Sequence, residues 1–179
     1  MKKLMILAAG MMLAVGANAA TVGWSLGGAA AYAGDAYQFF VIGQKGATDI
    51  ATITTLLDAG TSTAGYALGS GVIGSAGSVL QSPAGSGQTL GAGTYTAFFV
   101  VFDDATPKAG ESKYVVVSGQ TGMTKEIAST TANVSFGAGN VSSIVGDASN
   151  WKTYGEPEPT SALMMLFGLA GLALRRKRA

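Results

Sequence analysis

The sequence predicts a mainly β protein: a single antiparallel β-sandwich-like domain with one short helix, flanked by an N-terminal signal helix and a C-terminal transmembrane helix. Two observations predict this class. Short runs rich in β-branched and aromatic residues recur between turn-forming clusters. Only one stretch between the two ends has helical spacing. The expected parts are residues 1–19, 20–155 and 156–179, and the middle part is long enough to bury one core.

Runs with the composition of strands lie at residues 22–26, 36–42, 94–102, 113–117, 131–136, 141–145 and 151–154. The run 94–102 is apolar on both faces towards its end, which predicts a central strand buried on both sides. Because the polar run 103–112 has turn composition, 94–102 and 113–117 are expected to pair as a hairpin. Within 131–136, Ala132, Val134 and Phe136 face one way. A turn over 137–140 is expected before the strand 141–145.

One helix is predicted after residue 48. Thr48 is a suitable N-cap, and Asp49 would stabilise the positive start of the helix. Gly60 is expected to end it, because glycine tolerates left-handed geometry. The apolar side chains that share one face are Ile50, Ile53, Leu56 and Leu57. The β-branched run 52–55 also favours a strand, so that alternative stays open.

Residues 60–93 consist largely of Gly, Ala, Ser and Thr. One interpretation is a long flexible loop or a few weak strands. The other is a flat, repetitive Ser/Thr surface of the kind that ice- or glycan-binding β-solenoids present. No fixed period recurs in the segment, which favours the first interpretation.

Missing residue types exclude several kinds of chemistry. The chain has no His and no Cys, so it has no Ser-His-Asp triad, no thiol nucleophile and no disulfide. Zinc and copper sites lose their best ligands. Without the basic residues of the two ends, five lysines face ten acidic residues and no arginine remains, so no nucleic-acid footprint is present. We expect no cofactor and no catalytic site.

Carboxylates are the remaining candidate groups. Asp103 and Asp104, followed by Glu111, form the densest acidic patch, which either binds calcium or is a solvated turn. A glycosidase pair could be drawn from Asp35, Asp49, Asp58 and Glu126, although glycosidases need a larger scaffold with a cleft. The turn and the scattered surface carboxylate are the commoner situations.

Aromatic residues and two short motifs offer further candidates. A sugar-stacking platform could be built from Trp24, Tyr32, Tyr37, Trp151 and Tyr154, although such residues more often belong to a core. The segments beginning at Asn133 and Asn140 match the N-glycosylation pattern, which arises easily by chance in a Ser/Thr-rich chain.

The N-terminus has the three parts of a signal peptide. Lys2 and Lys3 form the charged region, and residues 4–15 form the apolar region. Ala17 and Ala19 supply the small residues of a signal-peptidase site. We expect cleavage after Ala19, with cleavage after Ala20 as the alternative. The apolar run is shorter than the roughly 20 residues that span a bilayer.

The C-terminus has three elements in order. Pro157, Glu158 and Pro159 come first, and the uncharged, largely apolar run 160–174 follows. The chain then closes with a basic cluster of Arg175, Arg176, Lys177 and Arg178. Such a cluster stops transfer and stays in the cytoplasm, so the run 160–174 is expected to hold the precursor in the inner membrane. An ordinary C-terminal anchor would have a similar run, and would also place the body outside the cytoplasm.

This order of elements resembles the sorting tail of PEP-CTERM proteins, which are exported by Gram-negative bacteria. The resemblance covers the last two dozen residues only. It implies that an exosortase recognises Pro157-Glu158-Pro159 and removes the tail, after which the protein reaches the cell surface or the exopolysaccharide matrix. The signal peptidase and the exosortase are therefore the expected processing partners.

Taken together, these features predict an exported structural or adhesive protein of the cell surface or extracellular matrix, without catalytic activity. Low charge, abundant Gly, Ser and Thr, and exposed strand edges suit self-association. The alternatives are a module that binds exopolysaccharide and a small secreted hydrolase. An exposed row of aromatics would favour the first alternative, and converging carboxylates in a cleft would favour the second.

Overall fold

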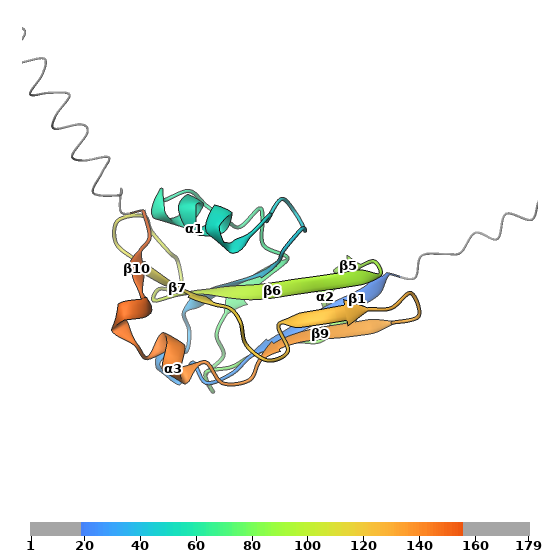
Figure 1. The fold of residues 1–179 in the computed structure, drawn as a ribbon. Coiled ribbons are helices and arrows are strands. Elements are labelled where there is room, and N and C mark those ends of the chain that lie inside the picture. The colour runs from blue at the N-terminus through green and yellow to red at the C-terminus, as the bar shows by residue number, and fades with distance from the viewer. Residues whose placement is uncertain (1–18, 156–179) are drawn as a thin grey trace, which may run out of the picture.

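In the computed structural model, which describes residues 19–155, two β-sheets pack together and a helix covers the far side of one of them (Figure 1). The first sheet contains β1 (Ala20–Leu26), β4 (Val79–Gln81), β5 (Thr89–Leu90) and β9 (Asn133–Ala138). The second contains β2 (Ala36–Val41), β3 (Gly69–Val72), β6 (Gly93–Phe102), β7 (Lys113–Val117), β8 (Thr124–Ile127) and β10 (Lys152–Thr153). The helices are α1 (Ile50–Asp58), α2 (Pro83–Ser86) and α3 (Ser142–Val145), with 3-10 turns η1 (Ala30–Tyr32) and η2 (Ala148–Asn150). The mainly β class is confirmed.

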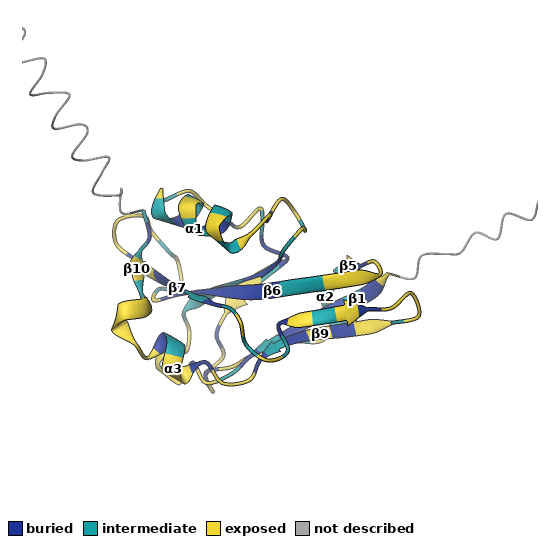
Figure 2. Cartoon of the chain, in the orientation of Figure 1, coloured by how far each residue is buried: buried dark blue, intermediate teal, exposed yellow. Residues whose placement is uncertain are grey.

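β6 is the central strand of the second sheet. It pairs antiparallel with β2 on one side, and with β8 and then β7 on the other. Ala97, Phe99 and Val101 point towards the first sheet, whereas Phe98 and Val100 point towards α1. Figure 2 shows the residues in the second half of the strand as buried, and since they alternate between the two sides, the strand is covered on both. The predicted central strand and its hairpin with 113–117 are therefore confirmed.

Two aromatic stacks mark the two cores. Between the sheets, Trp24 stacks on Phe39 with ring centroids 4.8 Å apart. On the other side of the second sheet, Phe40 stacks on Phe98, also at 4.8 Å. Leu57 of α1 is fully buried in this second core. Because the middle of the second sheet is buried on both faces, the strands β2, β6 and β7 are largely apolar along their length.

The first sheet corrects the expectation of a purely antiparallel sandwich. β1 lies in its middle and pairs antiparallel with β4 and β5 along one edge. Along the other edge it pairs with β9 in parallel, in the register Thr21 with Asn133. Strand composition alone does not set the direction of a pairing between segments more than a hundred residues apart.

The predicted helix is present as α1, with a different first residue. Asp49 is the N-cap, because its carboxylate accepts a hydrogen bond from the Thr52 N–H at 2.6 Å. Thr48 instead bonds the Thr52 hydroxyl at 3.0 Å, which corrects its predicted role. Gly60 ends the helix as predicted, with φ at +70° and its N–H bonded to the carbonyl of Leu57.

Residues 141–145 were predicted as a strand, and the structure corrects this to the short helix α3. The apolar residues Val141, Ile144 and Val145 are spaced as on one helical face, and Val141 and Val145 are buried. Asn140 accepts the Ser142 N–H at 3.0 Å, which starts the turn. β9 also extends through Ala138, beyond the predicted start of the turn at 137.

The Gly-rich segment 60–93 forms short elements: β3, β4, α2 and β5. Its glycines allow large neighbours to approach. A Cβ atom on Gly69 would lie 2.1 Å from Cζ2 of Trp24. One on Gly23 would lie 2.6 Å from Cδ of Pro83, at the start of α2. The segment therefore contributes β3 to the second sheet and β4 and β5 to the first, as the interpretation of a few weak strands expected.

Candidate functional site

The processing residues lie at or beyond the limits of the described chain. Ala17, Pro157, Glu158, Pro159 and the basic cluster at 175–178 fall outside residues 19–155, as do the predicted signal and transmembrane helices. At the other limit, Ala19 is exposed, whereas Ala20 is fully buried and pairs with Leu90 in β1 and β5. Cleavage after Ala19 would leave β1 whole, and cleavage after Ala20 would remove a buried residue.

The last described residues are held firmly to the body. The N–H of Tyr154 donates to the Ser112 carbonyl at 2.9 Å, and that of Gly155 donates to the Leu57 carbonyl at 2.8 Å. Gly155 has φ at +79°, and a Cβ there would lie 2.7 Å from that of Ala109. Only residue 156 separates this anchored glycine from the Pro-Glu-Pro motif. The two limits of the described body lie at its opposite ends (Figure 1).

The candidate sugar platform does not assemble. Trp24, Tyr37 and Tyr154 are buried, at 4%, 6% and 8% exposure, and the Trp24 indole N–H bonds the Tyr37 hydroxyl at 3.3 Å inside the core. Tyr32 and Trp151 are half-buried and stack on each other at 4.6 Å. Both also donate hydrogen bonds to the Val145 carbonyl. The aromatic residues therefore serve packing, as the commoner interpretation expected.

In the acidic turn after β6, two carboxylates accept hydrogen bonds from nearby backbone N–H groups. Asp103 accepts the N–H of Lys113 at 2.5 Å, and Asp104 accepts the N–H of Thr106 at 3.0 Å. Glu111 forms an exposed ion pair with Lys108 at 3.7 Å. Within residues 19–155 no group of three acidic side chains is arranged to hold a metal ion. The geometry is that of a closed turn.

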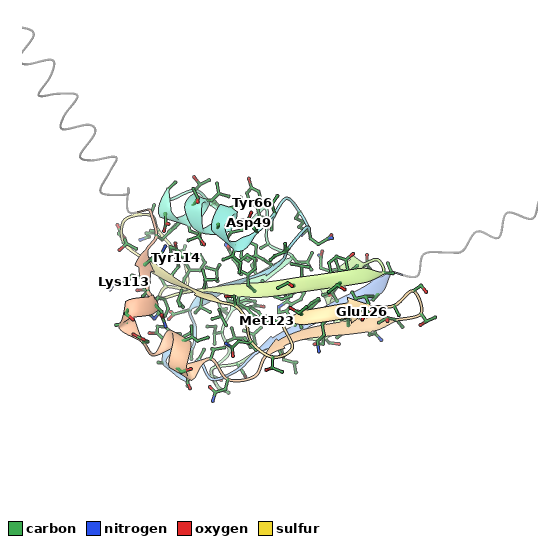
Figure 3. All side chains as sticks on the ribbon, in the orientation of Figure 1. Asp49, Tyr66, Lys113, Tyr114, Met123 and Glu126 are labelled. Carbon is green, nitrogen blue, oxygen red and sulfur yellow. The ribbon has the colours of Figure 1, made fainter. Side chains whose placement is uncertain are left out.

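The other candidate carboxylates are spread over several elements. Asp35 precedes β2, and its pKa is raised by burial and by the nearby charges of Asp103 and Asp104. The pKa of Asp49 is lowered, mainly by the Thr52 N–H that it caps. Glu126 is exposed on β8, and Figure 3 shows it away from Asp49. These residues do not converge on one cleft.

A shallow pocket of about 420 Å³ lies where α1, β7, α3, η2 and β10 meet. Val116, Ile50 and Ile144 supply apolar surface, and the remaining lining residues are Thr54, Tyr114, Ser118, Asn150 and Lys152. β10 pairs with β7 only at Lys113 and Tyr114, so the edge of β7 beyond Tyr114 opens towards this pocket. None of the sequence-predicted site residues lines it. Sequence reasoning missed the lining residues of this pocket because they come from five separate elements.

Tyr114 closes one end of the pocket through a hydrogen-bonded cluster. Its hydroxyl donates to Asp58, and Lys152 lies 3.5 Å from the other oxygen of that carboxylate. Burial, followed by the bond and charge of Asp58, raises the pKa of Tyr114 well above its usual range. The cluster ties the end of α1 to β7 and β10. The neutral Tyr114 phenol already donates its hydrogen bond to Asp58, so its role here is to hold these elements in position.

The two glycosylation-like motifs both lie at the surface. Asn133 is exposed at the start of β9, where its side-chain oxygen accepts a hydrogen bond from the Thr21 hydroxyl. Asn140 is exposed and accepts the Ser142 N–H, as described above. Both amides therefore have structural partners.

Three comparisons give the context for this site. Neither the known family models, nor the curated proteins, nor the solved structures contain a match to this chain. Among the helices of residues 19–155, none has the length and apolar character to cross a membrane.

Proposed function

We propose that this chain is an exported structural or adhesive protein of the cell surface or extracellular matrix, processed at both ends in the manner of PEP-CTERM proteins. The supporting observation is the agreement between the folded body and the predicted mature segment. β1 begins at Ala20, directly after the expected signal-peptidase site, and the last anchored residue is Gly155, just before Pro157. Removing both ends would leave every described core residue in place.

A structural role fits the side chains better than the two alternatives do. Four of the acidic side chains accept hydrogen bonds within a turn, a cap or the Tyr114 cluster: Asp49, Asp58, Asp103 and Asp104. Three of the five aromatics proposed for sugar stacking are buried in the cores. An exopolysaccharide-binding module would need such rings at the surface, and a hydrolase would need converging acids. The absence of catalytic activity remains part of this proposal.

Cell fractionation of the native host tests the proposal. Wild type is expected outside the inner membrane, lacking its tail. A Pro157→Ala/Pro159→Ala double variant is expected to accumulate in the inner membrane at full length, since the recognition motif is lost. Pro107→Ala, a proline substitution in the loop after β6, is the matched control and should behave as wild type. A double variant that is sorted normally, or wild type found in the cytoplasm, would contradict the proposal.

A further inference from the structure

Charge is distributed unevenly over the body. Within residues 19–155 the charged residues are Asp35, Lys45, Asp49, Asp58, Asp103, Asp104, Lys108, Glu111, Lys113, Lys125, Glu126, Asp147 and Lys152. None belongs to β1, β4, β5 or β9, and none belongs to α2. The whole first sheet is therefore uncharged, while acidic residues outnumber lysines on the rest of the body.

The outward face of this sheet, called here the uncharged face, follows from strand alternation. Val22 and Trp24 of β1 point into the core, so Thr21 and Ser25 point outward. Their cross-strand partners share the outward side and are Leu80, Thr89, Asn133 and Gly137, with Ser135 beside Gly23. α2 lies against the middle of the face, where Gly23 has no side chain to obstruct it.

Two features of the uncharged face favour a protein partner. Leu80 is 84% exposed, and the only other large apolar side chain exposed within residues 19–155 is Val72, on the second sheet, at 58%. The edge strand β9 is also open in its first half, whereas the Gly137 N–H in its second half bonds the Gly122 carbonyl at 3.2 Å. Its flanking carbonyls at Ala132 and Ala138 bond to β1, so by alternation the backbone groups of Asn133 and Ser135 point away from it.

Edge strands are commonly protected by lysine, proline or a bulge. The opposite edge of the first sheet has such protection, because α2 with Pro83 interrupts it between β4 and β5. Asn133–Ala138 has no charge and no proline. The sheet therefore leaves part of one edge without such protection, and this edge adjoins the uncharged face, of which α2 covers the middle.

We propose that the uncharged face docks a second copy of this chain, face to face and with two-fold symmetry. A body with an excess of acidic residues repels its own copy wherever charged surfaces meet, and this face avoids that repulsion. With the two-fold axis beside Leu80, the exposed Leu80 side chains of the two copies pack against each other, a contact that a hydrated polysaccharide would not offer. The biological use of this contact, self-association in the matrix, rests on the proposed function, whereas the contact itself does not.

The size of the face sets the expected strength. Three strands at about 4.8 Å spacing and about seven residues at roughly 3.3 Å each outline on the order of 330 Å², and α2 lies over the middle of that outline. A standard stable interface buries about 800 Å² per partner. The pair is therefore weak and concentration-dependent, and it becomes populated where many copies are crowded together.

Sedimentation equilibrium on the processed protein purified from its host, from low micromolar to millimolar concentration, tests the contact. The average mass of wild type should rise towards that of a dimer. Leu80→Lys and Ser135→Lys each place a charge on the uncharged face and should keep the protein monomeric. Val72→Lys is the matched control, an exposed apolar residue of an edge strand outside the face, and should associate as wild type does.

Two outcomes would overturn the proposal. One is wild type that stays monomeric over the whole concentration range, and the other is an equal effect of Val72→Lys and Leu80→Lys on association. Thermal unfolding of each variant ensures that a loss of association is not a loss of folding. Sorting of the tail is measured separately, by fractionation. A protein that associates but keeps its tail refutes the proposed function alone, and a sorted monomer refutes this inference alone.

Discussion

Replacing Gly69 with alanine tests whether the Gly-rich segment 60–93 is packed structure or loosely attached chain. The new Cβ would lie 2.1 Å from Cζ2 and 2.4 Å from Cη2 of Trp24, far inside contact distance. Trp24 cannot move freely, because it is 4% exposed, stacks on Phe39 and bonds the Tyr37 hydroxyl. Either the ring or β3 must shift.

The magnitude follows from the two interactions that are disturbed. Overpacking a core costs about 1–3 kcal/mol, and weakening an aromatic pair costs a further ~0.5–1.5 kcal/mol. We therefore expect Gly69→Ala to lower the free energy of unfolding by roughly 2–4 kcal/mol, a large part of the ~5–15 kcal/mol of a typical domain. For a body of this length each kcal/mol shifts Tm by about 3–5 °C.

Thermal unfolding followed by tryptophan fluorescence measures this effect, since Trp24 reports on the packed site. Gly91→Ala is the matched control: it lies in the same segment, has no atom within 4 Å of its added Cβ and has no left-handed φ. Its Tm should stay level or rise slightly, because alanine reduces the entropy of the unfolded chain. Equal Tm values for the two variants would refute the packing of β3 against Trp24.

Three further predictions concern the helix and the Tyr114 cluster. Asp49→Ala should lower Tm more than Thr48→Ala does, because Asp49 caps α1; the reverse order would contradict the cap assignment. Because burial raises the pKa of Tyr114, stability should fall as pH rises above about 10, where the unfolded phenol ionises, and Tyr114→Phe should flatten that alkaline loss in urea unfolding. Leu57→Ala should cost about 2–5 kcal/mol by the same assay, whereas the exposed Leu80→Ala should cost under about 0.5 kcal/mol.

The strands that the sequence predicted well are those whose side chains carry the pattern. The run 94–102 is apolar at every position facing either core, so it shows its place at the centre of the second sheet. The alternation of Val134 and Phe136 likewise marks the buried side of β9. Such strands are predictable because the apolar or polar character of their own residues indicates which faces are buried.

Other elements depend on partners that are distant in the chain. β3 consists of Gly-Ser-Gly-Val, and its position is set by Trp24 and Tyr37, which pack over its glycines. The parallel pairing of β1 with β9 joins segments more than a hundred residues apart. Residues 141–145 have both strand composition and helical spacing, and burial of Val141 with Val145 favours the helix. Local pattern does not decide such cases.

The candidate site was less predictable than the fold. Sequence reasoning selected carboxylates and aromatics by type, and the structure uses most of them in turns, caps and cores. The pocket between α1, β7 and α3 has a mixed lining in which no residue type stands out. The uncharged face is visible in the sequence only as stretches without charge, and strand register is needed to join those stretches into one surface.

The intact mass of the protein recovered from its native host, with both termini sequenced, tests the central claim most directly. We expect a chain that begins at Ala20, because β1 needs that buried residue, and that ends between Pro157 and Thr160. A chain that still ends at Ala179 would contradict the account, and would make the protein a membrane-anchored one that no sorting enzyme processes.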